Sequence, residues 1–339
     1  MRKPRFQDPP FSIRTLDEGK RNESHSPEQI LPLLPAIHRR SPGELIGAGR
    51  NINGCIEKEL NLDRLADVQN WLWVAGLPFP PRALHQQLLL GRKIFITEQM
   101  DMHLVWTTGR IFIKPLPRML LEPDFWTRYL TCESGCKCTV ELNKDFPTSE
   151  QRCGHKMLRR RALGFLFSYA ALISHESDFY IAKDKYLLPG ELKWPDWRIF
   201  VDQLDTQHIY PYIDPRFFHG ELRLGRLNKI YMLSLRSLNG YMPRWNEYSA
   251  FFNDYFTWLT SGTIYIAIAL SAMQVGLATN SLGDSKIFQS VSYGFTVFSI
   301  LGPVIAVAII IIQFFGIFVW NWAKADLWKK IRYSQMIQR

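Results

Sequence analysis

The chain has 339 residues, of which 47% are hydrophobic and 14% aromatic, and its formal net charge is +10. This composition excludes a wholly disordered tether, because the apolar fraction, with 11 tryptophans, can build a buried core. The basic balance suits an anionic membrane surface as well as nucleic acid, and the apolar stretches near the C-terminus favour the membrane, so no nucleic-acid partner is expected.

Residues 1–60 open the chain with scattered prolines, serines and charged residues. They hold no apolar run of the kind that forms a secretory signal, and Asp8, Asp17 and Glu18 argue against a transit peptide. The composition predicts a disordered arm on a domain that stays in the cytosol. The five cysteines are therefore expected to be reduced.

Residues 61–244 have the apolar spacing of a folded cytosolic domain. Apolar residues recur every third or fourth position in Leu62–Ala75, which predicts a helix capped by Asn61. Met157–Tyr186 predicts a central buried helix, because its nearly all-apolar middle, 162–173, is too short to cross a bilayer. Three runs rich in β-branched and aromatic residues predict a small antiparallel β-meander: Lys93–Thr97, His103–Thr107 and Ile111–Lys114. The expected fold class of this domain is mainly α, with an α+β arrangement.

Two long stretches without a charged residue follow. Residues 258–278 and 295–320 are each long enough to cross a bilayer as a helix, which needs about 20 apolar residues. An aromatic amphipathic segment, 245–257, leads into the first span, a loop of 279–294 joins the spans, and a basic tail, 321–339, ends the chain. By the positive-inside rule the basic tail predicts that both ends lie in the cytosol and the loop lies on the luminal or extracellular side.

Small residues recur at close spacing in both spans. Glycine, alanine and serine at such positions let helix backbones approach each other, so we expect the two helices to pack together or the chain to form a homo-oligomer. The predicted packing residues are Ala267, Ser271, Ala272 and Gly276 in the first span and Gly302 and Ala306 in the second.

Four of the five cysteines cluster with one histidine inside the predicted domain. Thiolate and imidazole are the donors that zinc prefers, so this set could hold a structural zinc ion. The spacing is not the paired Cys-x2-Cys of common zinc folds, and reduced loop thiols explain it more simply. The candidate ligands are Cys132, Cys136, Cys138, Cys153 and His155.

A basic run follows the cysteines at the start of the predicted central helix: Lys156, Arg159, Arg160 and Arg161. Cations at a helix start oppose the helix dipole, so the position favours a bound anion, such as a lipid headgroup, or acidic neighbours. A solvated face paired with residues such as Glu150 is the simpler interpretation of this charge run and is favoured over the lipid headgroup.

Acidic residues and histidines also occur together in three further places: His175-Glu176-x-Asp178, Asp202 with Asp205 and His208, and His219-Gly220-Glu221. Each could bind a metal or transfer protons, but polar residues at helix ends explain them more simply, since none has a spacing with a known mechanism. No nucleophile elbow, phosphate-binding loop or dinucleotide motif occurs in the sequence. We therefore expect no enzymatic activity, no catalytic residues and no cofactor other than the candidate zinc.

Several runs of the chain resemble an ascomycete fungal family of membrane proteins defined by a domain of unknown function: Gly91–Pro117, Arg160–Ala182, Gly220–Tyr231, Tyr265–Thr279 and Ser292–Pro303. The resemblance covers nearly everything after residue 60 and implies two transmembrane helices near the C-terminus. Some members are labelled subtilisin-like proteases, a label that the motifs of this chain do not support. The resemblance supplies no catalytic or binding residues.

Three functions fit these observations. The favoured one is a non-catalytic, hairpin-anchored adaptor or scaffold whose partners are the membrane and either proteins or anionic lipid headgroups. An oligomeric ion channel or transporter with the layout of CorA-type magnesium channels is the alternative, although Gly276-Leu-Ala-Thr-Asn280 replaces the Gly-Met-Asn signature of such channels. A membrane enzyme that acts on lipid is the third.

Overall fold

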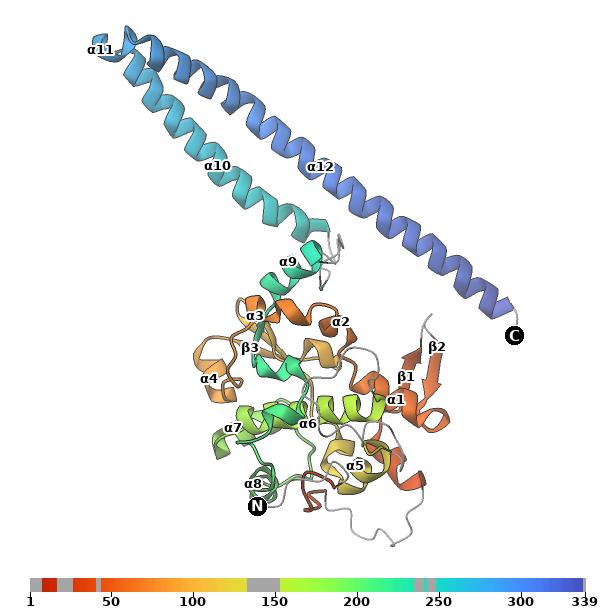
Figure 1. Cartoon of the computed structure of the whole chain (residues 1–339). Helices are drawn as coiled ribbons and strands as arrows, with labels where there is room; N and C mark the ends of the chain where they lie inside the picture. Colours follow the sequence, from red (N-terminus) through yellow and green to blue (C-terminus); the bar gives the residue numbers. More distant parts are fainter. Residues whose placement is uncertain are drawn as a thin grey trace. The chain divides into compact units, whose positions relative to one another are not determined.

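The computed structural model describes residues 8–16, 27–40, 44–132, 153–234, 241–242 and 248–337. The chain divides into two compact units, Met1–Ser237 and Leu238–Arg339 (Figure 1). The first unit combines helices with two small sheets, and the second is made of helices. This arrangement confirms the predicted class, an α+β domain with a hairpin of two apolar helices.

The first unit is mainly helical. Its α-helices are α1 (Ile52–Glu59), α2 (Asp63–Ala66), α3 (Leu72–Ala75), α4 (Leu84–Leu89), α5 (Pro123–Tyr129), α6 (Gly154–Leu172), α7 (Glu176–Asp184), α8 (Trp194–Gln203) and α9 (Leu224–Ser234). Short 3-10 helices lie at Pro27–Leu33, Ala48–Arg50, Gln69–Trp71, Met100–Met102, Arg118–Leu121, Tyr210–Tyr212 and Pro215–Phe218.

The strands form a two-stranded and a four-stranded sheet. Strands β1 (Ile37–Arg40) and β2 (Glu44–Gly47) pair antiparallel. The larger sheet has the order β3-β5-β4-β6 and contains β3 (Lys93–Ile96), β4 (Val105–Thr107), β5 (Arg110–Ile113) and β6 (Leu222–Arg223). The predicted antiparallel pairing holds for β4 and β5, which are joined through Gly109 at a positive φ of 71°. β3 instead pairs parallel with β5, so the three predicted strands do not form a meander.

Helix α6 lies in the core of the first unit. Its buried side chains include Phe165, Leu166 and Tyr169, in agreement with the prediction of a central buried helix. The predicted helix Met157–Tyr186 is nevertheless two helices, because Ile173 leaves the helical conformation at φ −118° and ψ 76°. The buried Asp178 carboxylate then caps the start of α7 by accepting a hydrogen bond from the His175 N–H.

The predicted helix Leu62–Ala75 is also divided, into α2, a 3-10 turn and α3. Its expected apolar face is buried all the same, since Leu65, Val68 and Leu72 are each 1% exposed. Successive short turns bury these three side chains as well as one continuous helix would, so the backbone need not form a single helix here.

The structure does not confirm the predicted disordered arm in the part of residues 1–60 that it describes, where α1 and both strands of the smaller sheet lie. Phe11 is buried, with its ring centroid 4.6 Å from that of Phe200 and 6.2 Å from that of Trp126. The backbone N–H of Ser12 donates to Oε1 of Gln203 at 2.7 Å. Burial of an aromatic ring such as Phe11 offsets the conformational entropy that this proline- and serine-rich segment loses when it becomes ordered.

The second unit contains α10 (Tyr248–Leu277), the short α11 (Asn280–Gly283) and α12 (Lys286–Ile337). Helix α12 starts earlier than predicted, so the connection is shorter than the expected loop of 279–294. Polar side chains such as Gln289 and Ser292 suggested a loop, but they do not break a helix as glycine or proline pairs do. The expected tail of 321–339 continues α12 as far as Ile337.

Candidate functional site

The most extended feature of the second unit is its pair of apolar helices. Leu259–Leu277 and Lys286–Gly316 are both long and apolar enough to cross a membrane. Nineteen helical residues rise about 28 Å, close to the thickness of the hydrocarbon core of a bilayer. Most side chains in these segments are exposed, which in water would leave a large apolar surface uncovered.

The faces that α10 and α12 turn toward each other differ in part from the predicted packing set. Gly302, Ala306 and Gly276 are partly covered, and a Cβ on Gly276 would lie 2.7 Å from Cζ of Phe288. Three of the predicted residues are exposed instead: Ala267, Ser271 and Ala272. Among the α10 residues whose side chains are described, those partly covered are Leu259, Ile266, Ala269, Leu270, Met273 and Gly276. Small residue size indicated candidate packing positions. Which side of α10 packs against α12, however, depends on how the side chains of the two helices interlock.

Two of the predicted patch arginines point into the first unit. Arg159 is buried, donates a hydrogen bond to the backbone carbonyl of Asp8, and lies 5.6 Å above the ring of Trp126. Arg160 donates to the carbonyl oxygen of Ile213 from Nε at 3.1 Å and from Nη2 at 2.8 Å. Both guanidinium groups therefore stabilise the fold, and the predicted continuous surface patch does not form.

Arg161 has a different environment. It donates to the carbonyl oxygen of Leu60 at 3.3 Å and to Oδ1 of Asp63 at 2.8 Å. Its side chain also lines a cavity of about 460 Å³, together with basic residues including Lys58. Lys156 is half-buried and does not line this cavity. Of the predicted patch, Arg161 is thus the residue that lines a cavity, and the acids Glu57 and Asp63 line the same cavity.

The candidate cysteine ligands are only partly described. Sγ of Cys132 lies 3.3 Å from Sγ of Cys153, so two of the predicted thiols are adjacent in the fold. Cys136 and Cys138 lie outside the described residues. Nδ1 of His155 lies 3.1 Å from the carbonyl oxygen of Tyr129, a distance at which the imidazole can donate a hydrogen bond there. Zinc binding by this set stays a prediction.

A cluster of two histidines and one aspartate forms where α4 meets α7. The Asp178 carboxylate is fully buried, and its Oδ1 lies 2.8 Å from both the backbone nitrogen and Nδ1 of His85. Its Oδ2 accepts from the His175 N–H at 3.0 Å and lies 3.5 Å from Nδ1 of His175. Burial acts to raise the pKa of Asp178, but these hydrogen bonds outweigh it and lower the pKa, so the carboxylate is ionised.

The sequence pointed to His175 and Asp178 but not to His85. His85 lies ninety positions before His175 and no local spacing connects the two. Only the packing of α4 against α7 brings them together, with ring centroids 5.4 Å apart.

The other two acidic and histidine groups have structural roles. Glu221 accepts hydrogen bonds from Arg92 at 2.6 Å and from Gln87 at 2.8 Å, which together with other bonds lower its pKa although burial raises it. Asp205 and His208 form an exposed pair at 3.1 Å. Glu221 thus forms a buried ion pair with Arg92, and Asp205 pairs with His208 at the surface, so both groups have a structural explanation.

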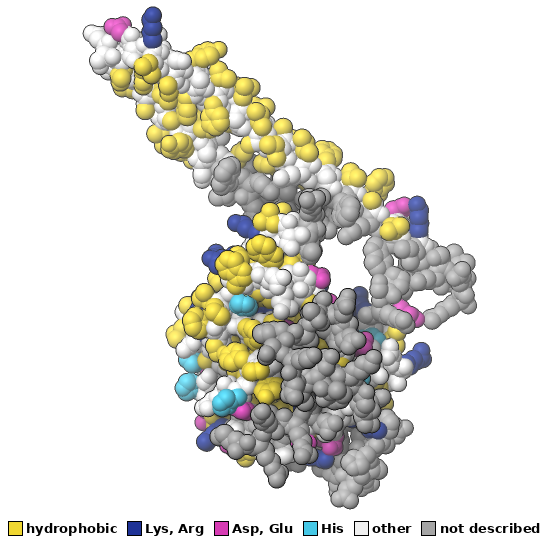
Figure 2. Space-filling view, in the orientation of Figure 1, with side chains coloured by type: hydrophobic (Ala, Val, Ile, Leu, Met, Phe, Trp, Pro, Cys, Tyr) yellow, Lys and Arg dark blue, Asp and Glu magenta, His cyan; other side chains and the backbone are white. Residues whose placement is uncertain are grey.

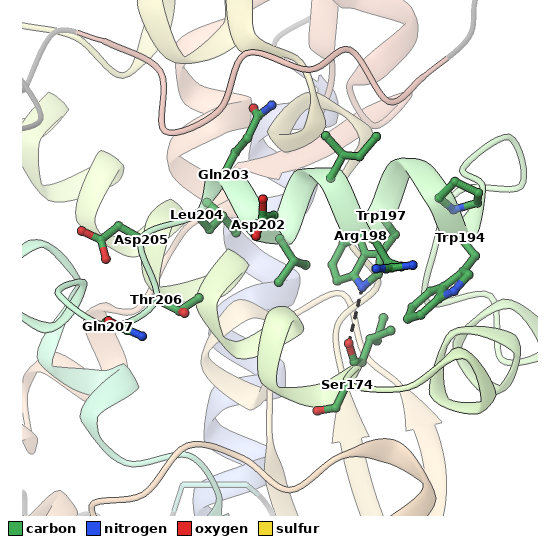
Figure 3. A pocket seen from close by; sticks show the side chains of 14 residues that line it. Ser174, Trp194, Trp197, Arg198, Asp202, Gln203, Leu204, Asp205, Thr206 and Gln207 are labelled. Carbon is green, nitrogen blue, oxygen red and sulfur yellow. Dashed lines mark hydrogen bonds between the residues drawn. The ribbon is translucent and has the colours of Figure 1, made fainter. Parts of the chain in front are cut away.

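An open groove of about 1000 Å³ runs along α8 (Figure 3). Trp194 and Trp197 lie at one end of it, and Asp202 and Asp205 lie toward the other. Nε1 of Trp197 donates a long hydrogen bond of 3.5 Å to the Ile173 carbonyl. The groove is shallow and lined by mixed polar and apolar groups, without a set of converging acids or bases among the described residues.

Several large apolar side chains of the first unit are exposed, and Figure 2 shows apolar groups at its surface. They gather over α3, α4 and β3. We call this set the apolar surface: Trp71, Trp73, Leu77, Phe79, Leu89, Phe95 and Ile96, exposed by 40% to 83%. The Arg110 guanidinium lies 5.5 Å above the Phe95 ring, and Arg226 donates to the Val74 carbonyl at 3.1 Å. Two cations therefore lie beside residues of the apolar surface or next to them in the chain.

Comparison with known proteins identifies one family. A family model described as a family of unknown function, DUF6601, matches residues 52–303. The match includes most of the first unit, all of α10 and the first part of α12. No curated protein and no solved structure matches the chain. Because the family model covers well over half of the 339 residues, the chain belongs to the DUF6601 family of unknown function.

Proposed function

We propose that this protein is a non-catalytic, membrane-anchored adaptor whose folded domain lies against an anionic membrane surface. The hairpin of α10 and α12 is the anchor, and both chain ends lie in the cytosol. The apolar surface carries the proposal, since a soluble protein rarely exposes so many large apolar side chains on neighbouring chain segments unless they bind something.

The chemistry of the apolar surface favours lipid over a protein partner. Tryptophan concentrates at membrane interfaces because one side of its ring system is apolar and its N–H is polar. Exposed cations accompany the aromatic groups, namely Lys93, Arg110, Arg223, Arg226 and Lys229. Each basic side chain near an anionic leaflet contributes about 1 kcal/mol of attraction.

The chain path also favours lipid. Helix α9 contacts α3, which carries Trp73, and α9 ends at Ser234. Helix α10 begins at Tyr248, 14 positions later in the chain. A membrane-inserted hairpin therefore keeps the apolar surface at a high local concentration of lipid.

Hydroxyl-radical labelling of the full-length protein in nanodiscs tests this function. With anionic lipid we expect Trp73 and Phe79 to be protected, while Tyr186, which is exposed outside the apolar surface, stays reactive. Labelling of all three at equal rates would contradict the proposal. Protection of Trp73 only after a cell extract is added would instead indicate a protein partner.

A further inference from the structure

The histidine and aspartate cluster at the junction of α4 and α7 has the composition of a metal site. One ligand atom from each of His85, His175 and Asp178 lies within 4.8 Å of the other two. Two imidazoles and a carboxylate are donors that zinc and similar divalent transition metals accept, and three protein ligands leave a fourth position for water.

The carboxylate is already fixed in the orientation that a metal ligand needs. Backbone N–H groups of His85 and His175 each donate to one oxygen of Asp178, so the side chain cannot rotate freely. Each oxygen keeps a second lone pair, which faces an imidazole. Hydrogen-bonded carboxylates of this kind are typical supports of metal sites.

The distances require only small movements. Ligand atoms on a tetrahedral zinc ion lie about 3.3 Å apart, given bonds of about 2.0–2.1 Å. Nδ1 of His175 lies 3.5 Å from Oδ2 of Asp178, and Nδ1 of His85 lies 2.8 Å from Oδ1. The His175 side chain is 69% exposed and can adjust without disturbing the core.

We propose that His85, His175 and Asp178 bind one divalent metal ion of the zinc class and thereby join α4 to α7. The site is separate from the predicted cysteine ligands and does not depend on the proposed adaptor function. Metal binding here would strengthen a junction that two hydrogen bonds between His85 and Asp178 already hold in part.

The test uses full-length protein in detergent, stripped of metal with a chelator and titrated with Zn²⁺ by calorimetry. We expect one ion per chain and at least about 100-fold weaker binding in His175→Ala, because loss of a supporting group alone costs about 10–100-fold. His208→Ala is the matched control, since its imidazole is also 69% exposed and also pairs with an aspartate. It should bind zinc as the wild type does.

Cobalt substitution separates this site from the cysteines. A site of nitrogen and oxygen ligands gives no thiolate charge-transfer band, and Cys153→Ser should leave binding unchanged. The proposal is overturned by the absence of stoichiometric zinc, by equal affinity of wild type and His175→Ala, by equal loss in His208→Ala, or by a thiolate band that Cys153→Ser removes.

Discussion

The ring of Phe217 lies directly against Gly164 in the middle of α6. A Cβ on Gly164 would come within 2.2 Å of Cδ2 of this ring, and Phe217 is itself buried. Glycine in a helix interior normally costs about 0.5–1 kcal/mol relative to alanine. Because Gly164 has no side chain, the Phe217 ring can approach the helix backbone. This contact positions the 3-10 turn Pro215–Phe218 on α6.

Gly164→Ala should therefore destabilise the protein by about 1–3 kcal/mol, since the added methyl group overpacks a filled site. Gly154→Ala is the control, because it lies at the start of the same helix with nothing within 4 Å of the added Cβ. Chemical denaturation of both variants measures the difference. Equal stability of the two variants would contradict the observed contact.

Lys114 is a second position where a single substitution should be costly. Its side chain is 1% exposed, and Nζ donates to Oε2 of Glu59 at 2.6 Å and to the Glu98 carbonyl at 2.7 Å. Lys114→Ala should reduce the free energy of unfolding by about 3–5 kcal/mol, because it leaves Glu59 without its partner in a poorly solvated place. Lys185→Ala, which breaks an exposed pair with Asp184, should cost about 1 kcal/mol or less. A small effect at both positions would show that water replaces the lost partner of Glu59.

Acid should destabilise the first unit through His103. This imidazole accepts a hydrogen bond at Nδ1 from the Lys114 N–H, so Nε2 carries the proton and donates to Oγ of Ser168. Burial, followed by the charges of Arg216 and Lys114, lowers the pKa of His103 well below its ordinary value of 6.5.

The unfolded chain therefore binds a proton near pH 6.5 that the folded chain does not bind, and stability should fall as the pH drops below that value. Denaturant unfolding at pH 7.5, 6.0 and 5.0 measures this loss. His103→Gln should be less stable at pH 7.5 but should show a flatter pH dependence. An unchanged slope would assign the acid sensitivity to other groups.

We expect the apolar part of α12 to insert into the membrane. Ile309 is half exposed within the apolar part of α12, so Ile309→Lys should weaken membrane insertion by about 3–4 kcal/mol. Leu327→Lys places the same charge on the same helix but beyond the apolar segment, and it should have little effect. Alkaline extraction of membranes measures the fraction of chain that stays inserted. Equal extraction of both variants would contradict insertion of this helix.

Patterns that repeat over a few residues were readable from the sequence. The two charge-free stretches predicted the apolar helices, and the apolar middle of Met157–Tyr186 predicted a buried helix, because burial of a helix face follows from residue spacing alone. The α+β class followed from the same local signals. Helix ends were less accurate, since Ile173 and the Asp178 cap act through their tertiary surroundings.

Relationships between distant residues were decided by the tertiary structure. The sequence left open whether Arg159 and Arg160 face an anion or a solvated surface, but they donate to the carbonyl groups of Asp8 and Ile213. It also gave no sign that His85 meets Asp178. What the sequence alone determined about this protein is an apolar helical hairpin attached to a folded α+β domain, because both depend on local hydrophobic pattern. Which charges are enclosed, which face of α10 meets α12 and which histidines share a carboxylate depend on chain segments that meet only on folding.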